Sequence, residues 1–433
     1  MIIDKNNFKN FKYFFLLLLI FLSFHRSPFI FLNGRFLAEE ATQHFIFALQ
    51  NNFFQNLIYY DELAGYFNLI PNLFTWISAN LKIQYAPLAT VYGSLIFIIL
   101  LPYLCLFRES NFLNSEIKKI LASLILFFSP PFVPEIWLNT INSQVYLCLI
   151  AILILFMINL TQKQKIINHI LIFFGGLSGI YTCALLPFFF IKHFFDKIKY
   201  NFINLVILLF TNTLQLIIIL RSKINDTLIY SDYDFRFDLD LLVNIFYNFI
   251  AKAVMARQLV YLIWDKLGFL INQNYYLLLL VFLILILMII SINFKSLANF
   301  CKKDQVFLYL SGIFIVISLV VIFGSLDNQV SGRYAVIPGS LLLLIYLHLF
   351  SIAKKLYLKI FFLVLVCTSL ISGLYEFRPP TINVKHQYLK LLDCLNCPIW
   401  SEEIQKWQSD KSYIIGVWPY PRKKLILGNI SID

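Results

Sequence analysis

The stretch Tyr275–Phe294 reads YYLLLLVFLILILMIISINF, and it decides the fold class. It contains no charged residue and is apolar on every face of a helix. A helix needs about 20 such residues to cross the hydrocarbon core of a bilayer. A strand of a membrane barrel would instead alternate apolar and polar residues over about ten positions. The stretch therefore predicts a transmembrane helix and excludes an outer-membrane barrel.

The chain as a whole has the composition of a membrane protein. Of its 433 residues, 60% are hydrophobic and only 13% are charged, and the mean hydropathy is +0.77. We expect an all-α polytopic membrane protein with about 11 transmembrane helices and folded outer-face loops. The expected spans are residues 13–32, 85–107, 120–133, 143–160, 168–180, 182–195, 202–220, 275–294, 305–325, 339–353 and 360–377.

The positions of the lysines predict the topology. The formal net charge is +12, but the basic residues form small clusters at the ends of the spans instead of one solvated face, which a nucleic-acid site would need. Such clusters are typical of cytoplasmic loops. Placing all of them on that side requires the region His169–Phe195 to cross twice, with a break near Tyr181. The N-terminus is then cytoplasmic, and the C-terminus lies on the outer face of the plasma (inner) membrane.

This topology puts the longer polar segments outside. Residues 1–377 form the expected transmembrane domain, and residues 378–433 form a small outer-face segment. Two loops, residues 33–84 and 221–274, are long enough to hold a site, and residues 326–338 form a shorter loop. Cys394 and Cys397 lie in the tail, and their spacing suits a disulfide or half of a metal site.

Two carboxylates, Glu39 and Glu40, follow the first span directly. Ionised groups at a membrane surface are costly unless they are paired or used. One of them could be a general base, or a ligand for a divalent cation such as Mg or Mn. The alternative is a carboxylate pair at a helix start that interacts with the backbone dipole or with Arg35. His44 lies one helical turn after Glu40 and could join the same site.

Arg333 lies in the short loop before the expected span 339–353. A guanidinium at a membrane mouth suits a phosphate group, because its planar fork binds two oxygens and never loses its charge. It could equally be a snorkelling or structurally paired arginine. Tyr66 belongs to an aromatic cluster in the first loop that could stack on a sugar ring, although tyrosines also anchor proteins at this interface.

A family resemblance rests on these motifs. Phe36-Leu37-Ala38-Glu39-Glu40, then Gly65-Tyr66 with Leu69–Leu73, and Gly332-Arg333-Tyr334 before Pro338 resemble a group of bacterial membrane proteins related to the C-type glycosyltransferases. The tail resembles the ending of that group, with Trp400-Ser401-Glu402-Glu403, Trp407 and Val417-Trp418-Pro419.

The resemblance implies transfer of a sugar from a polyprenyl-phosphate donor to a glycan, lipid or protein acceptor on the outer face of the membrane. Such enzymes carry an acidic residue of the first outer loop at the catalytic centre, and Glu40 matches it, with Glu39 supporting. Arg333 would bind the donor phosphate, and Tyr334 would line the lipid entrance. His44 and Tyr66 would complete the substrate site. No metal ligand is assigned, and a divalent cation stays open. Membrane lipid is an expected partner and nucleic acid is not.

Two other classes of function fit the sequence. A transporter or flippase of lipid-linked saccharides could use the same basic loops and the aromatic residues at the membrane surface. Such proteins typically show inverted repeats and charges at mid-membrane. No repeat is seen here, and charges within the expected spans are nearly absent. A non-catalytic scaffold could recruit partners through its tail. The enzymatic interpretation requires Glu39 or Glu40 to share one pocket with Arg333, although they are far apart in the chain.

Overall fold

A computed structural model describes residues 5–62, 64–128, 134–225, 241, 244–255, 304–324, 332–377, 397–419 and 423–427. The described chain is mostly helical, and its strands form two short antiparallel hairpins. The expected span 275–294 and Cys394 lie outside the described residues, so the number of spans stays a prediction. Cys397 takes part in a disulfide.

Five helical segments of the described chain are long and apolar enough to cross a membrane. This agrees with the predicted class of helical membrane protein. The five segments are Ile83–Phe107 (η2 and α6), Lys199–Ile224 (α11), Gln305–Gly324 (α16), Gly332–Ile352 (η6 and α17) and Leu356–Phe377 (α18).

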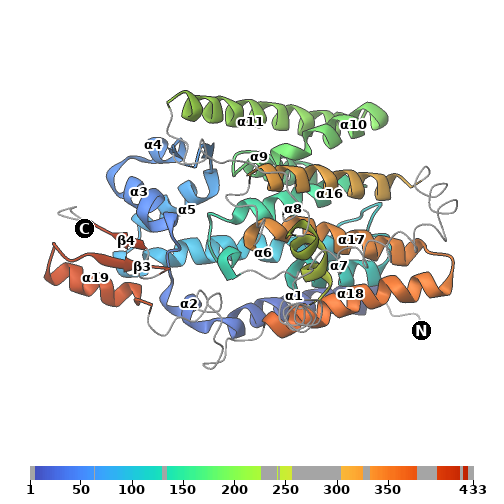
Figure 1. Ribbon diagram of the computed structural model, residues 1–433, viewed down its shortest axis with the longest axis horizontal. Helices are drawn as coiled ribbons and strands as arrows, with labels where there is room; N and C mark the ends of the chain where they lie inside the picture. Colours follow the sequence, from blue (N-terminus) through green and yellow to red (C-terminus); the bar gives the residue numbers. More distant parts are fainter. Residues whose placement is uncertain are drawn as a thin grey trace, which may run out of the picture.

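Further helices complete the bundle, and most of them lie along its long axis (Figure 1). Helix α6 packs on α7 and α8, α17 packs on α16 and α18, and α11 packs on α9 and α10. The further helices are α1 (Lys5–Arg26), α7 (Glu116–Phe128), α8 (Ser143–Phe156), α9 (Gln162–Gly176) and α10 (Leu186–Asp196).

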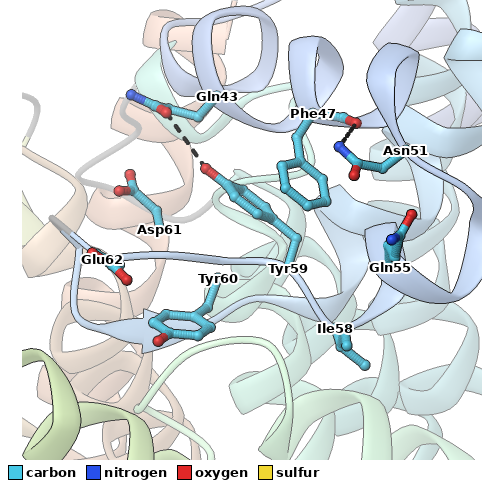
Figure 2. Close-up of a pocket in the computed structure, with 9 residues that line it drawn as sticks. All are labelled: Gln43, Phe47, Asn51, Gln55, Ile58, Tyr59, Tyr60, Asp61 and Glu62. Atoms are coloured by element: carbon cyan, nitrogen blue, oxygen red, sulfur yellow. Dashed lines mark hydrogen bonds between the residues drawn. The ribbon is translucent and has the colours of Figure 1, made fainter.

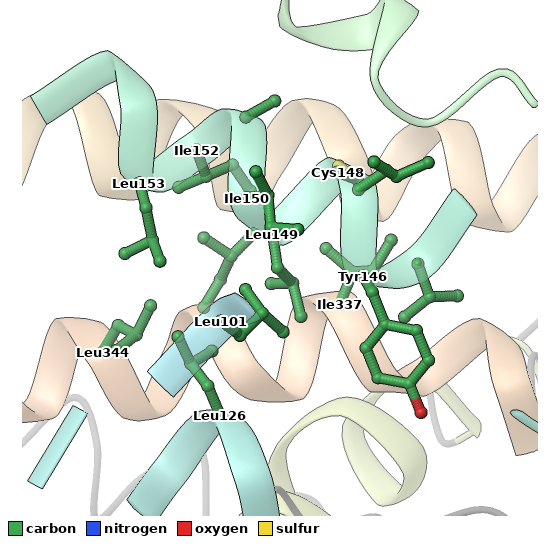
Figure 3. Packing of buried hydrophobic residues seen from close by; sticks show 14 of the residues in the cluster. Leu101, Leu126, Tyr146, Cys148, Leu149, Ile150, Ile152, Leu153, Ile337 and Leu344 are labelled. Atoms are coloured by element: carbon green, nitrogen blue, oxygen red, sulfur yellow. The ribbon is translucent and has the colours of Figure 1, made fainter. Parts of the chain in front are cut away.

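Helix α8 is the centre of the bundle, and every one of its 14 residues is buried. Its side chains are apolar all round, as expected for a helix with neighbours on all sides. Figure 3 shows Leu149 and Ile150 of α8 among Leu101 of α6, Leu126 of α7 and Leu344 of α17. The peripheral helices instead expose large apolar side chains, which suits contact with lipid. Examples are Phe210, Ile217, Phe323 and Ile371.

The lysine-rich turns of the described chain gather at one end of the bundle, which we call the basic end. Lys12 forms an ion pair with Glu116 at 2.7 Å, which joins the first helix to the start of α7. Ser110 and Met157 form a backbone bridge between the next two turns. Lys118 lies 3.4 Å from His348, close to the turn after α17. The opposite end, which we call the site end, holds the longer loops.

The chain also reverses within the region His169–Phe195, where the sequence predicted a break. Helix α9 ends at Gly176, a short 3-10 turn spans Cys183–Leu185, and α10 begins at Leu186. The first expected span is different. Residues 13–32 do not form one helix, because Ser27 is not helical (φ −149°, ψ 67°) and the next helix, α2, starts at Pro28 and ends at Asn33. Proline cannot donate the backbone hydrogen bond that would continue α1.

The first loop folds into several short elements at the site end. Apolar residues recur at helical spacing from Phe45 to Leu57, but the helix is interrupted at Asn52, whose side chain caps a new helix by accepting from the Gln55 amide at 3.0 Å. The elements are η1 (Glu40–Phe45), α3 (Ile46–Gln50), α4 (Phe53–Leu57), β1 (Tyr60–Asp61), β2 (Tyr66–Phe67) and α5 (Leu69–Ala79). In the second loop, η5 (Phe246–Ala251) leads into α13 (Lys252–Val254).

The described tail packs against this loop. Its elements are α19 (Trp400–Ser409), β3 (Ile415–Val417) and β4 (Lys423–Leu425), and they lie beside α3 at one end of the molecule (Figure 1). The indole of Trp400 donates to the Ile83 carbonyl at 2.6 Å, and its ring meets Phe36 edge-on. The Ala38 amide donates to the Trp418 carbonyl at 2.6 Å. The tail therefore fixes the backbone that precedes Glu39.

Gly373 allows α18 to pack closely on α7. A Cβ atom at this position would collide with the backbone carbonyl of Phe128, which cannot turn away as a side chain could. We expect Gly373→Ala to lower the free energy of unfolding by about 1–3 kcal/mol. Thermal unfolding in detergent measures this. Gly324→Ala is the matched control, because a Cβ there would meet only Ile180 at 3.9 Å. Equal melting temperatures for the two variants would contradict this account of the packing.

Candidate functional site

A buried polar segment, Glu135–Gln144, lies at the site end between α7 and α8. It begins in the 3-10 turn η3 (Pro134–Ile136) and is held by its own side chains. Asn139 donates to the Glu135 carbonyl at 2.6 Å and accepts from the Asn142 amide at 3.0 Å. Asn side chains commonly form such local bonds where a helix or turn ends. The segment therefore presents a fixed edge to the loops around it.

Glu40 is bound to this segment. Its side chain is fully buried, with one oxygen accepting from the amide and the hydroxyl of Thr140, both at 2.6 Å. The other oxygen accepts from the Leu37 amide at 3.0 Å. Burial raises the pKa of Glu40 because it disfavours the charged form, while these hydrogen bonds and Arg35 oppose the rise. Both carboxylate oxygens thus hold the first loop in place.

Arg35 ties the same segment to the tail. Its guanidinium donates to the Trp137 carbonyl at 2.7 Å and lies 5.1 Å from the ring centre of Trp418. Burial lowers the pKa of Arg35 to about 10, against the opposing charge of Glu40. At pH 7 the guanidinium is therefore charged and can stabilise a nearby carboxylate.

Glu39 has different surroundings from Glu40, although the two are adjacent. It is the N-cap residue of η1 and is partly exposed. Its charge contributes to raising the pKa of both Tyr66 and His44. Of the predicted pair, Glu39 is thus the partly exposed carboxylate, and Glu40 is the buried one.

Arg333 approaches the segment from the other side. It forms an ion pair with Glu135 at 3.2 Å, and both side chains are partly exposed. A second guanidinium nitrogen lies 3.4 Å from the Tyr334 hydroxyl. The preceding residue, Gly332, has a φ of +64°, a conformation that side chains rarely adopt. This turn places Arg333 at the start of α17.

Tyr66 lies between the two sides of the site. Its hydroxyl accepts from the Gln144 amide at 3.4 Å. Burial raises the pKa of Tyr66 and the charge of Arg333 opposes the rise, so the hydroxyl stays protonated at neutral pH. The segment Glu135–Gln144 therefore joins Tyr66 of the first loop, through Gln144, to the Arg333 turn, through Glu135, in one polar, aromatic cluster. The catalytic and binding roles of these residues stay predictions.

His44 is buried next to this cluster. Its Nδ1 atom lies 2.7 Å from the Asn72 side-chain oxygen, and its ring meets Tyr59 edge-on. Burial lowers the pKa of His44 because it disfavours the imidazolium form, while Asn72, Asp61 and Glu39 act in the opposite direction. Since Asn72 uses its nitrogen to donate to the Tyr59 carbonyl at 2.6 Å, its oxygen accepts, and neutral His44 donates.

The lowered pKa of His44 predicts an acid-sensitive fold. In the unfolded chain His44 binds a proton below about pH 6.5, whereas in the folded chain it stays neutral to lower pH. Stability from this group is therefore present above that pH and is lost as the pH falls. We expect the melting temperature in detergent to fall less between about pH 7 and 5 in His44→Gln than in the natural chain. Parallel pH profiles would contradict the prediction.

Sequence reasoning missed three residues of this cluster: Glu135, Thr140 and Tyr181. Tyr181, which follows the end of α9, interacts electrostatically with Arg333 and Tyr334. A signal for Thr140 was present, because five of the six residues in Asn139–Gln144 are polar although the run lies between two apolar stretches. Among the described residues, no three His, Cys, Asp or Glu side chains are grouped so that they could hold a metal ion.

No protein-family model, curated protein or solved structure matches this chain. Composition and fold define a helical membrane protein with a polar, aromatic site at one end of its bundle. Its function must therefore be argued from the site itself.

Proposed function

We propose that the chain is a membrane glycosyltransferase, related to the C-type enzymes, that moves a sugar from a polyprenyl-phosphate donor to a glycan, lipid or protein acceptor. The observation that supports it best is the segment Glu135–Gln144. Within this segment Thr140 holds Glu40, the neighbour of Glu39, and Glu135 pairs with Arg333. The Glu39 carboxylate and the Arg333 guanidinium, from distant parts of the chain, can therefore serve one substrate.

The donor phosphate would bind at Arg333. A polyprenyl phosphate keeps its tail in the bilayer and its phosphate at headgroup depth. Arg333 lies in the first turn of the apolar helical segment Gly332–Ile352. Its guanidinium is oriented by Glu135 and Tyr334, and it can share its remaining donors with phosphate oxygens. As the bond from the sugar to the phosphate oxygen breaks, the second negative charge on the leaving phosphate is stabilised there.

We assign the general base to Glu39 and a positioning role to Glu40, the reverse of the order that the sequence favoured. Glu40 is fully buried and uses both oxygens within the fold, whereas the Glu39 side chain is partly exposed, so a substrate can reach it. In the reaction the acceptor hydroxyl attacks the anomeric carbon, its proton passes to Glu39, and polyprenyl phosphate leaves. General-base assistance of this kind typically contributes about 10²–10⁴ in rate.

The proposed orientation follows from the lysines. Lys12, Lys118 and their neighbours at the basic end would face the cytoplasm, and the site end would face outward. Donor and acceptor would then meet on the outer surface of the plasma membrane.

The test uses the full chain in proteoliposomes with a radiolabelled polyprenyl-phosphate sugar. Appearance of label in an acceptor, with release of polyprenyl phosphate, supports the proposal. Movement of intact labelled lipid across the bilayer without cleavage would instead identify a flippase. If neither transfer nor movement is seen with any donor sugar, the scaffold interpretation replaces the proposal.

A further inference from the structure

A pocket of about 530 Å³ lies in the first loop, and it is separate from the Arg333 cluster. Figure 2 shows it between the short helices and the β1 strand. Amides, aromatic rings and two carboxylates line it, and none of the described lining residues is a lysine or arginine. The lining residues are Gln43, Phe47, Asn51, Gln55, Ile58, Tyr59, Tyr60, Asp61 and Glu62.

The three amide side chains of this pocket are each fixed by a hydrogen bond at one end. The Gln43 oxygen accepts from the Tyr59 hydroxyl at 3.4 Å, and the Gln55 oxygen accepts from the Asn52 amide at 3.1 Å. The Asn51 nitrogen donates to the Phe47 carbonyl at 2.9 Å. The opposite end of each amide can bind a ligand, which gives two NH₂ donors and one carbonyl acceptor. Hydroxyl groups both donate and accept, so a polyol matches this set.

The aromatic residues add an apolar surface to the polar rim. The rings of Phe47 and Tyr59 are stacked with their centres 4.1 Å apart, which makes a rigid pair. Such rings supply contact area with little loss of conformational freedom. A sugar ring has an apolar face of C–H groups and a rim of hydroxyls, so it can use both parts of the pocket.

The described lining is acidic and disfavours a phosphate ligand. Asp61 and Glu62 are both carboxylates, and the guanidinium of Arg221 lies outside the lining, 6.0 Å from the Tyr60 ring centre. An anion would meet like charges here, which costs binding energy. The donor, whose phosphate suits Arg333, therefore does not fit this pocket.

The pocket is nevertheless connected to the site. Tyr59 lines it, and the Tyr59 ring meets the His44 ring edge-on with their centres 5.4 Å apart. Burial lowers the pKa of His44, and the charges of Asp61, which lines the pocket, and of Glu39 both oppose that shift. A ligand in the pocket would thus lie on the Glu39 side of the cluster, where the acceptor must enter.

We propose that this pocket binds an uncharged saccharide unit of the acceptor. This inference rests on the proposed function and specifies its acceptor as a glycan chain or glycolipid without acidic sugars. The carboxylates and amides would bind pairs of hydroxyls, and the Phe47–Tyr59 pair would support the ring.

The test measures acceptor binding and transfer separately, with the full chain in nanodiscs. Saturation-transfer NMR with cellotetraose and chitotetraose as uncharged probes, and a tetragalacturonate as the anionic probe, reports binding without turnover. We expect the uncharged probes to bind and Asn51→Ala combined with Glu62→Gln to weaken them about tenfold. In the transfer assay the same variant should raise the acceptor KM about tenfold with kcat within about twofold. Gln50→Ala, an exposed neighbour on α3, is the control.

Two results would overturn the inference. One is preference for the anionic probe, and the other is an acceptor KM that the pocket variant leaves unchanged while transfer proceeds. The binding arm keeps the two proposals distinguishable. If no donor supports transfer but the uncharged probes bind and the pocket variant weakens them, the transferase proposal fails and the saccharide site stands.

Discussion

Glu39→Gln is expected to reduce kcat for sugar transfer by about 10²–10⁴ while the protein keeps its melting temperature. The amide has the size of the carboxylate, but it cannot take the proton of the acceptor hydroxyl. Glu39 is partly exposed at the start of η1, so the change removes little packing. Initial rates at saturating donor and acceptor measure the effect, together with thermal unfolding of the same preparation.

Glu40→Gln is the matched control, because it makes the same chemical change one residue away. A glutamine at position 40 would turn an NH₂ group toward either the Leu37 amide or the Thr140 amide and hydroxyl. A buried donor left without an acceptor costs about 1–3 kcal/mol, so this variant should lose stability. If Glu39→Gln retains full activity and Glu40→Gln loses turnover without loss of stability, our assignment of the base is wrong.

The sequence predicted the broad fold because hydrophobic length is a local property. The five long spans can be read from composition alone, and the break near Tyr181 could be inferred from lysines at both ends of the region. The interruption at Ser27 could also have been found, because Pro28 forbids a continuous helix. The interruption between α3 and α4 at Asn52 depends on a cap that also occurs in other contexts.

The candidate site was harder to predict because its geometry depends on long-range contacts. Adjacent glutamates look equivalent in a sequence, and only burial against Thr140 separates Glu40 from Glu39. The partner of Arg333 is Glu135, which follows a proline-rich stretch of sequence and belongs to no motif that we singled out. Tyr59 and Tyr60 belong to the aromatic cluster of the first loop, which could equally anchor the protein at the interface. The pocket that they line could not be predicted, because it forms only when the loop folds through β1.

Arg333→Ala is expected to reduce kcat over KM for the donor by about 10²–10³. The guanidinium would stabilise charge that grows on the phosphate as the sugar leaves, so the loss should appear in kcat as well as in the donor KM. The acceptor KM should stay unchanged, because the pocket lined by Asn51 and Glu62 does not include Arg333. Steady-state kinetics with each substrate varied in turn measures this.

Arg333→Lys is the control that separates charge from structure. A lysine keeps the positive charge but loses the bidentate fork, so it should restore part of the activity and not all of it. The ion pair with Glu135 is partly exposed, so its loss should lower stability by less than about 1 kcal/mol. Arg333 would be merely structural if Arg333→Ala lost activity only in proportion to lost folded protein. A donor kcat over KM unchanged in Arg333→Ala would place the phosphate elsewhere, and with it the reacting end of the donor.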